Sequence, residues 1–92
     1  MRLILYSKPG CHLCEGLQEK LEQISRLKFE LEIRDITTRD DWFQHYQYEI
    51  PVLFLAPSSS SPDLILLPRF SPRASVQQVE QMLQKFWNDP AQ

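Results

Sequence analysis

The sequence predicts an α/β domain in which a four-stranded mixed sheet is flanked by helices, in the order β-α-β-α-β-β-α. An apolar run at the N-terminus, a helical pattern and an alternating run form a β-α-β unit. Two further apolar runs, separated by a turn-rich segment, are typical of an antiparallel hairpin. The chain has 92 residues and is 42% hydrophobic and 24% charged, which indicates one globular domain spanning 1–92.

The first strand is expected at residues 2–6 (RLILY), because a nearly continuous apolar run is typical of a strand buried on both faces. Pro9 and Gly10 then mark a turn. The first helix is expected from residue 11 or 12 to Ser25. Its apolar residues recur at helical spacing and are expected to face the core; they are Leu13, Leu17, Leu21, Ile24 and Leu27.

The second strand is expected within residues 28–35 (KFELEIRD), where apolar and charged residues alternate with period two. One charged face suits a strand at the edge of the sheet. A short second helix is expected over 39–46, with Thr37 or Thr38 as its N-cap and acidic residues in its first turn.

The hairpin is expected to pair residues 50–56 (IPVLFLA) with residues 64–67 (LILL) across a long loop. Pro51 is acceptable at the start of a strand but not inside a central one. The last helix is expected to begin after Ser75 as its N-cap. Its apolar face comprises Val76, Val79, Met82, Leu83, Phe86 and Trp87.

Several functional classes are disfavoured by composition. The net charge is −2 and the basic residues are scattered, so binding to nucleic acid is not expected. Apolar runs are strand-sized, well short of the about 20 residues that span a membrane. The N-terminal apolar run is too short for the core of a signal peptide, so a reducing, cytoplasmic location is expected.

Both cysteines of the chain lie in one Cys-x-x-Cys motif, Cys11-His12-Leu13-Cys14. In a reducing compartment such a pair is expected to be catalytic or metal-binding, and its small loop would constrain the unfolded chain little. A zinc site needs four ligands, and only His12 and His45 could add to the pair. A zinc half-site and an inert pair therefore remain alternatives to a redox pair.

The element order, together with LYSKPGCHLC and EIPVLF, resembles the thioredoxin fold, and more narrowly the glutaredoxin-like family of short bacterial and plant proteins. The resemblance covers nearly the whole chain. It implies that Cys11 is the nucleophile, that Cys14 is the resolving cysteine, and that Pro51 is a cis-proline facing them.

The resemblance also implies a binding site for glutathione or a peptide. Ile50 would offer backbone groups, Lys8 would assist the thiolate and a glutathione carboxylate, and Tyr6 occupies an aromatic strand position next to the motif. The Gly-Gly pair that glutaredoxins carry after the last strand is replaced by LLPRFSPRAS, so Arg69 or Arg73 is expected to bind a carboxylate instead. His12 is a candidate for tuning the redox couple.

The chemistry agrees with these assignments, because a cysteine at a helix N-terminus lies near unpaired backbone N–H groups that favour the thiolate. The expected function is dithiol exchange on protein or glutathione mixed disulfides by a monomer. No tightly bound cofactor is expected, and glutathione or a thioredoxin-type reductase would supply electrons. The alternatives are a non-catalytic binding module and an iron–sulfur cluster carrier.

Overall fold

The computed structural model describes residues 2–56 and 64–87, with the backbone alone for Trp87, and confirms the predicted α/β class and element order. The Ser-rich loop (57–63), the C-terminal tail (88–92) and the Trp87 side chain lie outside the described residues. The elements are β1 (Arg2–Ser7), α1 (His12–Glu22), β2 (Glu30–Asp35), the 3₁₀ turn η1 (Ile36–Thr38), α2 (Asp40–Tyr46), β3 (Val52–Ala56), β4 (Ile65–Leu66) and α3 (Val76–Trp87).

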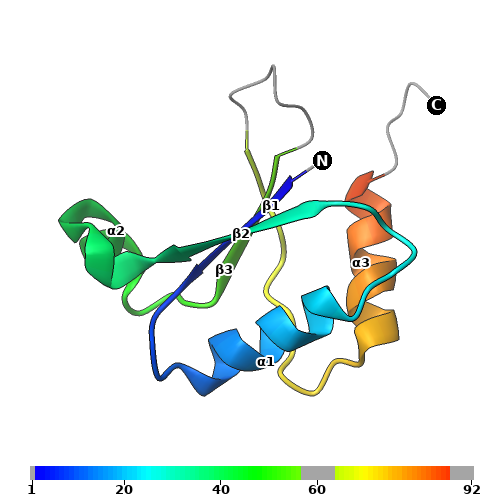
Figure 1. Ribbon diagram of the computed structural model, residues 1–92, viewed down its shortest axis with the longest axis horizontal. Helices are drawn as coiled ribbons and strands as arrows, with labels where there is room; N and C mark the ends of the chain where they lie inside the picture. Colours follow the sequence, from blue (N-terminus) through cyan, green and yellow to red (C-terminus); the bar gives the residue numbers. More distant parts are fainter. Residues whose placement is uncertain (1, 57–63, 88–92) are drawn as a thin grey trace.

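The strands form one mixed sheet in the order β2-β1-β3-β4 (Figure 1). β1 runs parallel to β2 and antiparallel to β3, and β3 is antiparallel to β4. β2 therefore lies at an edge, as its charged side chains predicted. β4 is shorter than the apolar run suggested, because only Ile65 and Leu66 pair as a strand.

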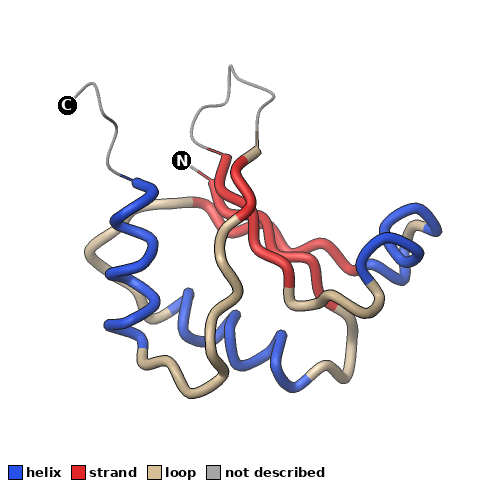
Figure 2. The backbone as a smooth tube through the Cα atoms, turned by 180° about the vertical axis from the view of Figure 1, so that it is seen from behind, coloured by secondary structure: helices blue, strands red, loops and turns tan. Residues whose placement is uncertain are grey.

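β1 lies at the centre of the sheet, and its residues Leu3–Tyr6 are buried on both faces, as the apolar run predicted. Leu3 and Leu5 pack with Leu21 of α1 and Leu83 of α3. Figure 2 shows these two helices on the same side of the sheet, with α2 apart from them. The larger core is therefore formed between the α1–α3 layer and one face of the sheet.

The opposite face of the sheet carries an aromatic cluster that includes Tyr6. The Tyr6 ring stacks on Tyr46 of α2 with centroids 4.3 Å apart, and meets the edges of Trp42 and Phe54. Arg34 of β2 donates to the Tyr6 hydroxyl at 2.7 Å and lies over the Trp42 ring. Burial within this cluster raises the pKa of Tyr46. The short α2 thus contributes aromatic rings to this face, and β2 adds the guanidinium of Arg34.

The helix boundaries differ from the sequence expectation in two places. α1 ends at Glu22 rather than Ser25, and Gln23 caps it with backbone bonds. The N-cap of α2 is Arg39, which makes no side-chain cap hydrogen bond, rather than Thr37 or Thr38. Both threonines lie in η1, whose N-cap residue Asp35 accepts from the Thr37 N–H at 2.9 Å. The Thr37 hydroxyl also donates to Asp35, at 2.6 Å, and these two hydrogen bonds hold the pKa of the Asp35 carboxyl below its usual range.

The expected cap of the last helix is confirmed. Ser75 Oγ accepts from the Gln78 N–H at 3.1 Å, and Gln78 Oε1 accepts from the Ser75 N–H at 2.8 Å. This reciprocal arrangement is a capping box, which satisfies two backbone donors at the start of α3. Across the described residues, no helix is long and apolar enough to span a bilayer.

Candidate active site

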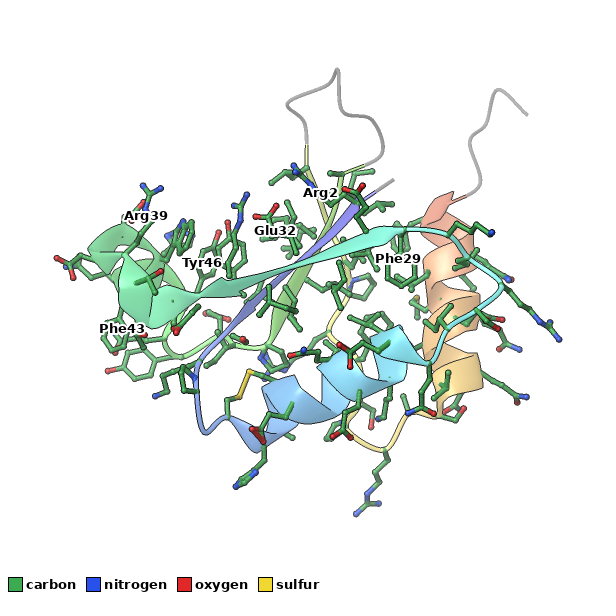
Figure 3. All side chains as sticks on the ribbon, in the orientation of Figure 1. Arg2, Phe29, Glu32, Arg39, Phe43 and Tyr46 are labelled. Atoms are coloured by element: carbon green, nitrogen blue, oxygen red, sulfur yellow. A yellow bond between two sulfur atoms is a disulfide. The ribbon has the colours of Figure 1, made fainter. Side chains whose placement is uncertain are left out.

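The two cysteines form a disulfide at the start of α1, where Figure 3 shows the sulfur–sulfur bond in yellow. Their Cα atoms are 5.3 Å apart. Cys11 is the N-cap residue of α1, and its Sγ accepts from the Cys14 N–H at 3.2 Å. Cys14 is only 2% exposed, whereas Cys11 is half-buried. Cys11 is therefore the more accessible sulfur, and it already receives one of the unpaired backbone donors of the helix.

A tight turn holds Cys11 at this helix start. The Cys11 N–H donates to the Lys8 carbonyl at 3.1 Å, which closes a turn through Pro9 and Gly10. Gly10 has a φ of +83°, a conformation that a turn of this kind requires at its third residue and that side chains disfavour. The Pro-Gly pair thus sets the direction in which the chain enters α1.

Gly10→Ala is expected to destabilise the domain by about 1–2 kcal/mol, because a Cβ is unfavourable at this positive φ. Gly16→Ala is the matched control: it lies inside α1 with nothing within 4 Å of an added Cβ, and should stabilise by about 0.5–1 kcal/mol. Urea denaturation of the oxidised variants measures both free energies of unfolding. Equal effects at the two glycines would contradict this view of the turn.

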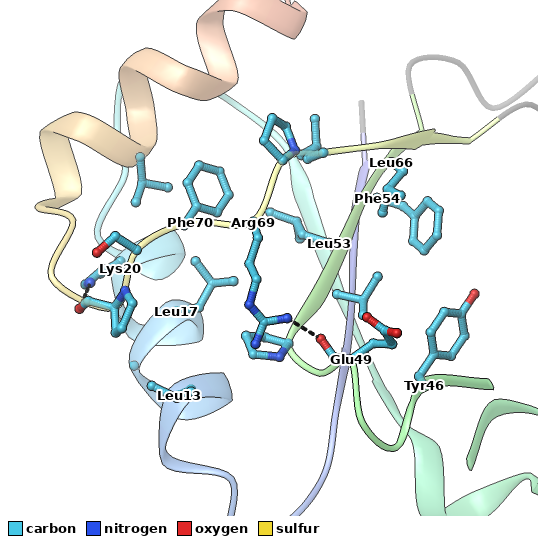
Figure 4. Close-up of a pocket in the computed structure, with 18 of the residues that line it drawn as sticks. Leu13, Leu17, Lys20, Tyr46, Glu49, Leu53, Phe54, Leu66, Arg69 and Phe70 are labelled. Atoms are coloured by element: carbon cyan, nitrogen blue, oxygen red, sulfur yellow. Dashed lines mark hydrogen bonds between the residues drawn. The ribbon is translucent and has the colours of Figure 1, made fainter. Parts of the chain in front are cut away.

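A groove of about 710 Å³ lies beside the cysteine motif, and its lining includes His12, Leu13 and Pro51. Figure 4 shows Leu13 on α1 and Leu53 on β3 among the residues that line it. Leu17, Leu53 and Phe70 contribute apolar walls. Polar groups reach it from several elements, namely Lys20, His45, Glu49 and Arg69. The groove can therefore hold a small ligand or a peptide segment next to the helix turn that carries the disulfide.

The Ile50–Pro51 peptide bond is cis, as the resemblance implied. The main chain just before it is engaged within the protein. Arg69 donates through its guanidinium to the carbonyls of Glu49 at 2.6 Å and Ile50 at 3.3 Å. The Ile50 N–H donates to the Tyr46 carbonyl at 3.1 Å. Ile50 was expected to offer these backbone groups to a substrate, but both already have internal partners.

Arg69 was expected to bind a carboxylate. In the structure its guanidinium instead donates hydrogen bonds to main-chain carbonyls, and the side chain lines the groove. Arg73, the alternative candidate, is exposed on the following turn. Tyr6 does not fit the predicted binding role, because its side chain is 4% exposed within the aromatic cluster on the opposite face. Its strand position put it next to the motif in sequence, but the alternation of the strand turned the ring to the other face.

Lys8 and His12 are exposed beside the motif. The Lys8 carbonyl closes the turn onto Cys11, and the role of the Lys8 ammonium stays a prediction. His12 Nδ1 lies 3.4 Å from a carboxylate oxygen of Glu15, one turn along α1. Both side chains are highly exposed, so this contact holds His12 only weakly.

Sequence reasoning placed Leu13 in the core, and this was wrong. Leu13 is 50% exposed, and the buried stripe of α1 runs instead through Cys14, Leu17 and Leu21, with Ile24 buried just after the helix. Sequence reasoning also missed Lys20, which lines the groove and whose ammonium donates to the Pro72 carbonyl at 2.9 Å. The spacing of Leu13, Gly16, Leu17 and Lys20 was the available signal, because residues so spaced share one helix face.

A zinc site would need about four ligating side chains gathered in one place. Within residues 2–56 and 64–87, no group of three or more His, Cys, Asp or Glu side chains is arranged to hold a metal ion.

The fold and the site define a thioredoxin-fold domain with a Cys-x-x-Cys disulfide at the start of its first helix. The family described as Glutaredoxin-like domain (DUF836) matches residues 2–84, and the chain belongs to this family. The fold is similar to that of thioredoxin 1 from the thermophilic eubacterium Thermosipho africanus TCF52B, with a TM-score of 0.61, 15% identity, and coverage of 94% of this chain and 93% of that one. No curated protein matches the chain.

Proposed function

We propose that the domain is a thiol–disulfide oxidoreductase that exchanges electrons through Cys11 and Cys14. The observation that carries this proposal is the disulfide itself: it lies at a helix N-terminus, beside a groove that Pro51 borders. Family membership supports the same conclusion, since the match spans the motif and the groove.

In the reducing direction, the Cys11 thiolate attacks a substrate disulfide. A bond forms between Cys11 Sγ and one substrate sulfur, and the other leaves as a thiolate that takes up a proton. Cys14 then loses its proton and attacks Cys11 Sγ, which forms the internal disulfide and releases the second substrate thiol. The substrate gains two electrons, and the domain is oxidised by the same two.

The reactivity of Cys11 rests on its thiolate, because the thiolate rather than the thiol is the nucleophile. The Cys14 N–H points at Cys11 Sγ, and the remaining first-turn donors of α1 add partial positive charge at the same place. Lys8, two residues before Gly10, supplies a full positive charge close by in the chain. These groups favour ionisation of Cys11 in the reduced domain.

The substrates are disulfides on proteins or small thiols, including glutathione mixed disulfides. A second thiol source must return two electrons to the Cys11–Cys14 disulfide after each cycle, and glutathione or a thioredoxin-type reductase has the right chemistry. A reducing compartment such as the cytoplasm suits this direction of the reaction.

The test combines a potential with a turnover assay. The oxidised fraction of the domain is measured by mass after alkylation, across dithiothreitol redox buffers and across glutathione buffers. Turnover is followed on insulin and on bis(2-hydroxyethyl) disulfide. We expect a single two-electron transition and reduction of at least one substrate above the rate of the donor alone. Titration without turnover on any disulfide would contradict the proposal and favour the binding module.

A further inference from the structure

The groove-facing edge of β3 changes its hydrogen-bonding partner at Pro68. Up to that point the partner is backbone: Phe54 pairs with Leu66, and the Leu67 N–H donates to the Leu53 carbonyl at 3.0 Å. Pro68 has no N–H to donate, so it cannot continue this pattern. Before the start of β3, the main-chain carbonyls at this edge can therefore be reached only by donors other than the backbone of residue 68.

Arg69 supplies these donors. One terminal nitrogen of its guanidinium donates to the Glu49 carbonyl at 2.6 Å, and the other donates to the Ile50 carbonyl at 3.3 Å. Figure 4 shows Arg69 reaching from the segment after β4 across to Glu49. Because Arg69 itself lines the groove, it meets both carbonyls from the groove side. Charged donors of this kind form stronger bonds than neutral ones.

The donor groups of the same loop are also unavailable. The Ile50 N–H is bonded to the Tyr46 carbonyl, and Pro51 has no N–H. An extended peptide that adds to a sheet edge gains its affinity from free main-chain N–H and C=O groups. The Glu49 and Ile50 carbonyls and the Ile50 N–H, just before Pro51, therefore do not offer that pairing while Arg69 is in place.

We propose that Arg69 is a positioning and specificity-determining residue, which fixes the loop carrying Pro51 and closes its main chain to strand-like pairing with a substrate. This inference rests on the proposed function and narrows its substrate class. The substrates are small disulfides and mixed disulfides, which are recognised through the groups next to their sulfur atoms. Extended polypeptides that form main-chain hydrogen bonds with Ile50 are not expected to be substrates. The apolar walls of the groove then contact the groups flanking the substrate sulfur.

The test uses three disulfide substrates with the full chain. The first is a short peptide whose cysteine is joined to 2-mercaptoethanol, the second is the same peptide with N-methylated amides on both sides of that cysteine, and the third is bis(2-hydroxyethyl) disulfide. N-methylation removes only the main-chain donors, so it reports strand-like pairing directly. The wild-type kcat/KM is expected to agree within about twofold between the two peptides, less than one net hydrogen bond would change it.

Arg69→Met removes the donors while keeping an unbranched side chain. It should lower KM for the unmethylated peptide by about threefold to tenfold, the change expected for one net hydrogen bond gained at the freed Ile50 carbonyl. The N-methylated peptide and bis(2-hydroxyethyl) disulfide should not share this gain, and Arg69→Lys should restore part of the wild-type pattern. Arg26→Met is the matched control, because Arg26 is exposed on the loop after α1 and carries the same charge.

Three results would overturn the inference. One is a loss of more than about fivefold on N-methylation in the wild type, a loss that would mean a substrate hydrogen bond is already made there. Another is an equal fall in kcat on all three substrates in Arg69→Met, which would indicate structural support alone. The third is absence of the KM gain. The affinity of both peptides for the oxidised domain, measured by titration, gives the same comparison without turnover. A domain that binds the peptides as expected but has no activity would therefore contradict the proposed function and not this inference.

Discussion

Cys11→Ser is expected to abolish disulfide exchange, with a loss on the order of a thousandfold or more, because the nucleophilic thiolate is gone. Cys11 is the half-buried member of the pair, and its Sγ receives the Cys14 N–H at the start of α1. Serine at an N-cap also accepts that backbone bond, so the fold should be retained. The measurement is the initial rate on bis(2-hydroxyethyl) disulfide, together with the unfolding transition of the reduced proteins.

Cys14→Ser is the matched variant, and its defect should differ in kind. Cys11 can still attack, but no internal thiol is left to resolve the product, so a mixed disulfide with the substrate should accumulate on Cys11. Its mass and its reversal by dithiothreitol identify this species. Cys14 is 2% exposed, which keeps it from meeting a bulky substrate first. Trapping on Cys14 in Cys11→Ser, instead of on Cys11 in Cys14→Ser, would contradict the assigned order.

The element order and the redox motif were predictable because they depend on local signals. A continuous apolar run, a period-two run and a helical repeat each specify one element, and Pro9-Gly10 specify the turn before Cys11. The Ser75 cap is equally local, since its partner Gln78 lies three residues away. Even the cis bond at Pro51 followed from the resemblance.

The predictions that were wrong concern residues whose positions depend on contacts between segments far apart in the sequence. Arg69 acts on Glu49 and Ile50, about twenty residues earlier, and no local pattern predicts which carbonyls an arginine will reach. Tyr6 was assigned by its nearness to the motif in sequence, whereas its ring belongs to the face that α2 covers. Leu13 belongs to an apolar repeat, but the first turn of α1 carries it to the groove, and Cys14 occupies the buried position in its place.

This reassignment of the buried stripe of α1 leads to the second large effect. Leu21→Ala should destabilise the domain by about 3 kcal/mol, because its side chain is 1% exposed and truncation leaves a cavity among Leu3, Leu5 and Leu83. Leu13→Ala makes the same chemical change on the same helix, but Leu13 is 50% exposed. Its cost should stay within about 0.5 kcal/mol.

Urea denaturation of the oxidised proteins, at fixed pH and salt, measures both free energies of unfolding. A loss of about 3 kcal/mol should lower Tm by about 12–24 °C in a domain of this size, so thermal scans provide a second reading. Leu21→Met, which conserves volume, should cost less than about 1.5 kcal/mol and keeps the comparison informative if Leu21→Ala is too unstable to purify. A cost at Leu13 equal to that at Leu21 would mean that the first turn of α1 is packed into the core after all. The groove beside Cys11 would then lack the apolar wall that Leu13 provides.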